Sequence, residues 1–163
     1  RRTWQNTTWG GIAGCFPPLI GWTAVTGRVG WEPLVLFLIV FWWTPPHTWA
    51  LSFRYREDYK AAGVPMLPVV REAPEVAVQI LVYTVATVAT SLVLWPVAHT
   101  GWIYGVVAVL AGAVFIVEAV QLLRRANAGL RDVVLKSMRL FHWSNTYLSL
   151  LFLAIAVDPL IHL

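Results

Sequence analysis

Residues 33–52, PLVLFLIVFWWTPPHTWALS, form an uncharged apolar segment that ends in a Pro-Pro-His string. A helix of about 20 residues is long enough to span the hydrocarbon core of a bilayer. Pro45 and Pro46 remove two backbone donors, so we expect the helix to kink or loosen there and to free carbonyl groups that need a partner or a cavity. The segment therefore predicts a membrane-spanning helix that carries a functional site near His47, and not a plain membrane anchor.

Four other segments share this apolar character, and the composition agrees with them. The chain is 58% hydrophobic and only 12% charged, which is unlike a soluble domain of this length. We therefore predict an all-α, polytopic transmembrane helix bundle that forms one integral membrane domain over residues 1–163. The five expected spans are residues 9–26, 33–52, 76–96, 102–123 and 140–161.

The basic residues gather in alternate connections between these spans. Those expected on one side of the membrane are Arg1, Arg2, Arg54, Arg56, Lys60, Arg71, Arg124, Arg125, Arg131, Lys136 and Arg139. The other side holds only Arg28. Because cytoplasmic loops collect Lys and Arg, this pattern predicts a cytoplasmic N-terminus and an external C-terminus. The net charge of +4 is explained in this way and needs no nucleic-acid partner.

A polar face is predicted at the cytoplasmic end of the second span. His47, Leu51, Arg54 and Asp58 have the spacing of one helix face, if the helix continues past residue 52. His47 would then lie about 10 Å deeper than Arg54. Two structural alternatives remain open: His47 hydrogen-bonds a neighbouring helix, and Asp58 forms a solvated salt bridge with the basic residues around it.

The fourth and fifth spans carry polar residues at helical spacing near the same side. On the fourth span, we expect Arg125 to contact Glu118 or Gln121 within the helix. On the fifth span, a second polar face is predicted from the i, i+3, i+7 spacing of His142, Asn145 and Ser149. His142 is either a residue that reaches to the interface or a ligand contact.

The first span contains Gly10 and Gly14, whose spacing is typical of close helix packing. Asn6 lies one turn earlier and offers an amide to a ligand.

Five strings resemble one known family. They are residues 1–6 (RRTWQN), 10–22 (GGIAGCFPPLIGW), 43–51 (WTPPHTWAL), 58–59 (DY) and 62–68 (AGVPMLP). Together they resemble the protoheme IX farnesyltransferase (heme O synthase) family, within the UbiA-type intramembrane prenyltransferase superfamily. The resemblance implies transfer of a farnesyl group from farnesyl diphosphate to the 2-vinyl group of heme B, which gives heme O and diphosphate.

The same resemblance implies that this chain is the C-terminal part of a longer protein. Members of the family have nine transmembrane helices, and the chain resembles the last five. The missing N-terminal half would carry the Asn/Asp-rich motif that binds magnesium and the prenyl diphosphate. We therefore expect the isolated chain to be inactive.

Site residues follow from the resemblance and from the chemistry of the reaction. Asp58 falls in the second acidic motif of the superfamily and is expected to help hold Mg²⁺, while the other acidic position of that motif falls on Tyr55. His47 is expected to ligate the heme iron or to transfer a proton, and His142 is a second candidate for heme binding. The candidate diphosphate contacts are Arg54, Arg56, Lys60, Arg1, Arg2 and Asn6.

The implied partners are farnesyl diphosphate, heme B, membrane lipid and the missing half of the chain, with heme A synthase or cytochrome oxidase assembly as further possibilities. The implied location is a bacterial inner membrane, with the mitochondrial inner membrane as the alternative. Two other functions remain open. One is a UbiA-type prenyltransferase that acts on a quinone precursor, and the other is a membrane subunit that handles heme without chemistry.

Overall fold

The computed structural model describes residues 3–161, apart from the side chain of residue 132. Every regular element in this range is helical, which confirms the all-α prediction. The elements are α1 (Asn6–Gly11), η1 (Ile12–Cys15), α2 (Phe16–Thr26), α3 (Trp31–Arg54), α4 (Arg56–Ala61), α5 (Leu67–Val70), α6 (Ala73–Val97), α7 (Trp102–Asn127), α8 (Asp132–Leu135) and α9 (Ser137–Ile161).

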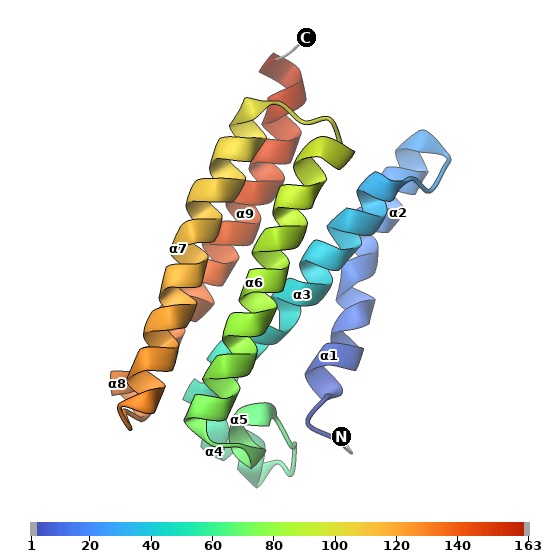
Figure 1. The fold of residues 1–163 in the computed structure, drawn as a ribbon. Coiled ribbons are helices and arrows are strands. Elements are labelled where there is room, and N and C mark those ends of the chain that lie inside the picture. The colour runs from blue at the N-terminus through green and yellow to red at the C-terminus, as the bar shows by residue number, and fades with distance from the viewer. Residues whose placement is uncertain (1–2, 162–163) are drawn as a thin grey trace.

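The four longest helices, α3, α6, α7 and α9, form a closed ring. α3 contacts α6, α6 contacts α7, α7 contacts α9, and α9 returns to α3. Successive helices run in opposite directions, and α1, η1 and α2 pack along the outside of α3 (Figure 1). The described chain is therefore an antiparallel four-helix bundle with one additional helical segment.

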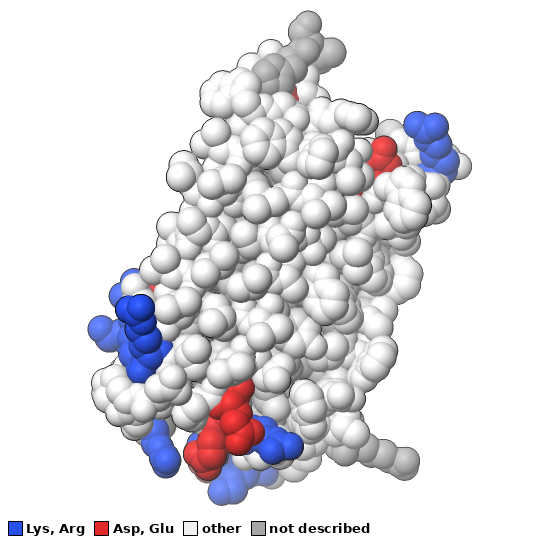
Figure 2. All heavy atoms as spheres, in the orientation of Figure 1, with Lys and Arg blue, Asp and Glu red and all other residues white. Residues whose placement is uncertain are grey.

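These four helices are each long and apolar enough to cross a membrane. On the face drawn in Figure 2, most charged side chains gather at the end of the bundle that carries α4, α5 and α8, and a wide uncharged belt lies above them. The N-terminal end of the described chain lies at this same end, and its C-terminal end lies at the other (Figure 1). The chain is an integral membrane protein. The prediction that the connections rich in Lys and Arg lie at one end of the bundle agrees with this arrangement.

The expected first span, residues 9–26, is built differently from the other four. It falls across α1, η1 and α2, none of which has the 18 residues required of a single spanning helix. The backbone at the junction residues Gly11 and Cys15 is still right-handed helical. The segment therefore follows a helical path in three pieces, and its crossing of the membrane stays a prediction.

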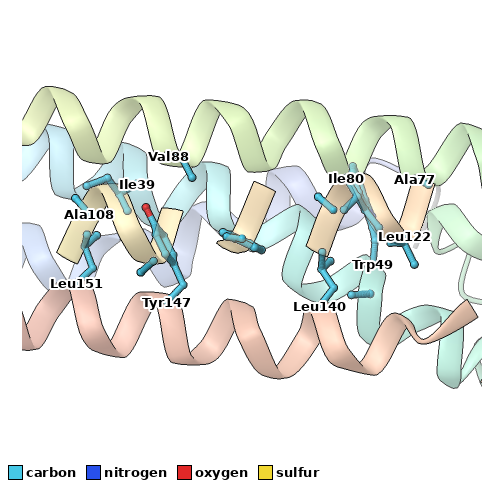
Figure 3. Packing of buried hydrophobic residues seen from close by; sticks show 14 of the residues in the cluster. Ile39, Trp49, Ala77, Ile80, Val88, Ala108, Leu122, Leu140, Tyr147 and Leu151 are labelled. Atoms are coloured by element: carbon cyan, nitrogen blue, oxygen red, sulfur yellow. The ribbon is translucent and has the colours of Figure 1, made fainter. Parts of the chain in front are cut away.

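The core is lined by residues that recur every three or four positions, as expected for helices that bury one face. All four helices contribute side chains that point between them (Figure 3). On α9 the buried face is Ser137, Leu140, Ser144, Tyr147, Leu151, Ala154 and Asp158. His142, Asn145 and Ser149, the predicted polar face of this helix, lie off this buried face, and all three are exposed in the described chain.

Buried hydroxyl groups join three of the helices inside this core. The Ser91 hydroxyl on α6 donates to the Thr87 carbonyl oxygen at 2.9 Å, so its oxygen is free to accept from the Tyr147 hydroxyl on α9 at 2.6 Å. The Tyr104 hydroxyl on α7 donates to the Ser91 carbonyl oxygen at 2.7 Å. These bonds set the relative height of α6, α7 and α9.

A second polar contact links the ends of α7 and α9. The Asp158 carboxylate on α9 is 1% exposed and accepts from the backbone N–H groups of Gly101 and Tyr104 at the start of α7. A carboxylate at this position satisfies donors that the helix leaves unpaired and complements the positive end of its dipole.

Close helix packing occurs at glycines other than those predicted. Nothing lies within 4 Å of a Cβ built on Gly10 or Gly14, so neither glycine makes a close helix contact with the described residues. A Cβ on Gly11 would instead lie 2.7 Å from Thr44 Cγ2 of α3. A Cβ on Gly112 of α7 would lie 2.8 Å from Val88 Cγ1 of α6.

We predict that Gly112→Ala destabilises the bundle, because the stiff β-branched Val88 side chain has to move. The expected loss is about 1–3 kcal/mol of unfolding free energy, as for other overpacked cores. Thermal unfolding in detergent measures it, and Val88→Ala in the same chain should restore most of the loss. An unchanged melting temperature for Gly112→Ala alone would contradict the close approach of α6 and α7.

Candidate functional site

His47 lies in an aromatic stack between α3 and α9. Its ring is stacked on Trp43, one turn earlier in α3, with 4.2 Å between ring centroids. On its other face it is stacked on Phe141 of α9, with centroids 4.6 Å apart. The imidazole plane is therefore fixed from both sides.

Hydrogen bonds to α9 fix the edge of the same ring. His47 Nδ1 lies 2.8 Å from the Ser144 hydroxyl oxygen, which in turn lies 2.7 Å from the carbonyl oxygen of Phe141. We assign the single hydroxyl hydrogen of Ser144 to the Phe141 carbonyl, and with that assignment the Ser144 oxygen accepts from His47 Nδ1–H. Trp43 Nε1 donates to the Ser144 carbonyl oxygen at 2.8 Å, which adds a second hydrogen bond between α3 and α9 beside the ring.

This arrangement has a chemical consequence for the second ring nitrogen. A neutral imidazole that carries its proton on Nδ1 has a free lone pair on Nε2. The structural alternative for His47, a hydrogen bond to a neighbouring helix, is thus present. It also orients the ring and leaves Nε2 able to bind a metal or accept a proton, so it does not remove the functional interpretation.

The second predicted histidine lies close to the first, although it is exposed. The His142 ring meets the Phe141 ring edge-on, with 5.3 Å between centroids. The Phe141 ring therefore contacts both of the predicted heme-binding histidines. The role of His142 stays a prediction.

The predicted polar face of α3 is confirmed in part. α3 runs helically through Pro45 and Pro46 to Arg54, so His47 and Arg54 lie on one continuous helix. The helix then ends at Tyr55, whose φ of −107° and ψ of 28° are not helical, and α4 begins at residue 56. The prediction that Asp58 continues this face is wrong, because Asp58 belongs to the next helix.

Charged residues gather on and beside α4 without pairing with each other. Asp58, Lys60 and Arg54 are exposed, and Arg56 is half-buried. In the described part of the chain none of the four takes part in an ion pair, so the predicted salt bridge of Asp58 is not seen there. These charges are accordingly available to a ligand.

The start of α1 lies against the loop that follows α4. The Thr7 hydroxyl lies 3.1 Å from Asn6 Oδ1 and 3.8 Å from the sulfur of Met66. A cavity of about 520 Å³ lies beside this contact and is lined by Thr3, Trp4, Gln5, Pro65, Val70 and Arg71. The structure thus brings Asn6 to the loop of residues 62–68, while Arg1 and Arg2 lie outside the described residues.

The predicted contact of Arg125 is confirmed with one of its two candidate partners. Arg125 Nη2 donates to Gln121 Oε1 at 2.7 Å within α7. Glu118 pairs instead with Arg139 of α9, with 2.6 Å between Arg139 Nη2 and Glu118 Oε1. The polar face of α7 therefore contacts α9 through its buried residue, Glu118.

Sequence reasoning missed the residues that hold His47. Trp43 could have been found, since it lies one helical turn before His47. Ser144 and Phe141 could not, because nothing in the sequence of α9 shows which of its faces meets α3.

These features define a polytopic helical membrane protein with charged groups at one end of an apolar bundle and an oriented histidine between two helices. Residues 1–145 match the model of the UbiA prenyltransferase family, and the chain belongs to this family.

Relatives cover the whole of this chain. It is 89% identical over 163 residues to a protein of Cutibacterium acnes named protoheme IX farnesyltransferase, which is 100% of this chain and 48% of that protein. Proteins of the same name from a Nocardioides species and from Streptomyces avermitilis are 60% and 55% identical, over 99% and 98% of this chain and 51% and 52% of their own lengths. The chain spans about half the length of the curated relatives it matches. No solved structure matches it.

We predict that Ser144 sets the proton position of His47. In ¹⁵N-histidine-labelled protein in detergent, the His47 resonances should show protonated Nδ1 and bare Nε2. Ser144→Ala should abolish this preference, because the acceptor for Nδ1–H is lost. His47→Gln assigns the resonances, and Ser149→Ala, on the exposed face of α9, serves as the matched control. A proton found on Nε2 in the unsubstituted protein would contradict the hydrogen-bond assignment.

Proposed function

We propose that this chain is the C-terminal part of an enzyme that transfers a farnesyl group from farnesyl diphosphate to the 2-vinyl group of heme B, giving heme O and diphosphate. The observation that carries the proposal is the identity of 89% over the whole chain to a protein named protoheme IX farnesyltransferase. The geometry supports it, since an apolar bundle that ends in unpaired charges suits a substrate with an apolar chain and a diphosphate head.

The charged end of the bundle is where the diphosphate would bind. As the diphosphate leaves the allylic carbon, negative charge develops on it, and cations positioned beforehand stabilise that charge. Arg54, Arg56 and Lys60 carry no competing ion pair in the described chain. Asn6, Arg1 and Arg2 complete the proposed diphosphate contacts, and the farnesyl chain would extend among the helices from the lipid.

The proposed metal is Mg²⁺, and Asp58 is its proposed protein ligand here. No group of three or more potential metal-binding side chains occurs among the described residues. Mg²⁺ is commonly held by one or two carboxylates together with phosphate oxygens and water, so Asp58 fits one position of such a site. Bound Mg²⁺ would supply neutralising charge to the diphosphate. The Asn/Asp-rich motif expected in the missing half would supply further ligands.

His47 is the proposed contact with heme B. Its free Nε2 is suited to iron ligation or to accepting a proton, and both roles are consistent with the Nδ1–H bond to Ser144. His142, whose ring also contacts Phe141, is the second candidate.

The proposed setting is the inner membrane of a bacterium, with the charged end of the bundle and the N-terminus cytoplasmic and the C-terminus outside; a mitochondrial inner membrane is the alternative. The isolated chain is proposed to be inactive without its N-terminal half. Heme A synthase or cytochrome oxidase assembly would be the consumers of the product.

The reaction is tested on the full-length parent protein with heme B, farnesyl diphosphate and Mg²⁺, with heme O detected by mass. We predict that Asp58→Asn lowers turnover by about 10- to 100-fold, by analogy with the loss of an electrostatic contact to developing charge. Glu57→Gln, the neighbouring exposed carboxylate, is the matched control and should change turnover less than threefold.

Each outcome of this assay decides between functions. A folded parent protein that forms no farnesylated heme would overturn the proposal, and prenylation of a quinone precursor in its place would assign the related activity. Heme binding without any transfer would favour a heme-handling subunit.

We also predict that His47→Ala weakens heme binding or slows farnesyl transfer in the same parent protein, since it removes the oriented Nε2 group. Heme titration followed by absorbance, together with the mass assay, separates the two effects. Unchanged binding and turnover would remove both proposed roles of His47.

A further inference from the structure

A cavity of about 200 Å³ lies between the end of α3 and the junction of α8 with α9, at the charged end of the bundle. It is lined by Phe53, Arg54, Val133, Lys136, Ser137 and Met138. No function described above depends on the α8–α9 side of this cavity.

The described charged residues that line the cavity all have the same sign. Its two charged residues, Arg54 and Lys136, are cations, and neither forms an ion pair with a described residue. The next cation along α9, Arg139, is already paired with Glu118 at 2.6 Å. Among the residues whose side chains the structure describes, the cavity therefore presents two positive charges without an ion-pair partner and no lining carboxylate.

Neutral donors line the same cavity. Ser137 is 4% exposed, and its hydroxyl makes no hydrogen bond to any described residue. Ser137 and Met138 also open the 25-residue helix α9, so their backbone N–H groups have no acceptor within the helix. A helix of this length adds its positive end to the same place. A tetrahedral oxyanion is the ligand that satisfies such a set of donors.

The surroundings favour an anion that belongs to a lipid. Val133 and Val134 on α8 are 73% and 57% exposed beside the cations, at the end of the bundle where the charged connections meet the membrane surface. Phe53 and Met138 add an apolar wall that a free phosphate ion would not need. Basic pockets between helices on the cytoplasmic side are typical sites for anionic lipid headgroups.

We propose that this cavity binds the phosphate group of an anionic membrane lipid. The phosphate is held by Lys136, Arg54, the Ser137 hydroxyl and the first N–H groups of α9, while the glycerol and first acyl carbons lie against Phe53 and Val133. The site anchors the α8–α9 junction to the membrane surface.

The test uses the full-length parent protein in neutral detergent and measures binding of short-chain phosphatidylglycerol, short-chain phosphatidylcholine and inorganic phosphate by titration or native mass spectrometry. We expect phosphatidylglycerol to bind at least about tenfold more tightly than phosphatidylcholine. Lys136→Gln and Ser137→Ala should each weaken phosphatidylglycerol binding by about fivefold, as expected for the loss of one charge or donor at the interface. Arg124→Gln removes an exposed charge at the same end and should leave binding within twofold.

The variants avoid Arg54, which is also a proposed diphosphate contact, so this test is separate from that of farnesyl transfer. Equal binding of the two lipids, or equal loss in the Arg124 and Lys136 variants, would overturn the lipid site. If inorganic phosphate binds tightly and depends on Lys136 and Ser137 while the lipids do not, the cavity holds a soluble anion and the lipid assignment fails.

Discussion

The four long helices are apolar on the faces they expose as well as on the faces they bury, and this condition governs the structure. Val82, Val109 and Leu153 are exposed, yet they are no more polar than the core. In a bilayer no hydrophobic force distinguishes the two faces, so small residues and polar contacts between helices decide how they pack. The bonds of Tyr104 and Tyr147 to Ser91, and the close approach of α6 and α7 at Gly112, perform this role here.

The position of His47 follows from the same condition. Polar groups inside an apolar bundle need partners from the protein, because water is absent. Ser144 is the partner of two such groups: its hydroxyl bonds to His47, and its backbone carbonyl accepts from Trp43 Nε1. The hydroxyl is itself committed to the Phe141 carbonyl. With the hydroxyl hydrogen assigned in this way, the residue that links α3 and α9 also leaves Nε2 as the imidazole nitrogen with a free lone pair.

This condition also explains how far the sequence could predict the structure. Hydropathy and length located the span of residues 33–52 within α3, and that of residues 102–123 within α7. The bilayer alone sets the hydropathy and the length that a spanning helix needs. The face of α9 could not be predicted, since exposed and buried positions have similar residues. The site was partly predictable for a related reason. The spacing placed His47 and Arg54 on one helix, but the break at Tyr55 that moves Asp58 to α4 carries no Gly or Pro signal.

The ion pair of Glu118 with Arg139 connects the core to the α8–α9 junction. Arg125 is two turns from Glu118 on α7, about 10 Å along the axis, and is held by Gln121. Glu118 is 7% exposed, and an unpaired carboxylate there would be costly, so it takes the cation that α9 supplies in its first turn. That pairing holds the first turn of α9 against α7 and cancels the charge of Arg139. The positive character of the neighbouring cavity therefore comes from Lys136 and Arg54, while the buried Glu118 holds the helix turn whose residues Ser137 and Met138 form part of its wall.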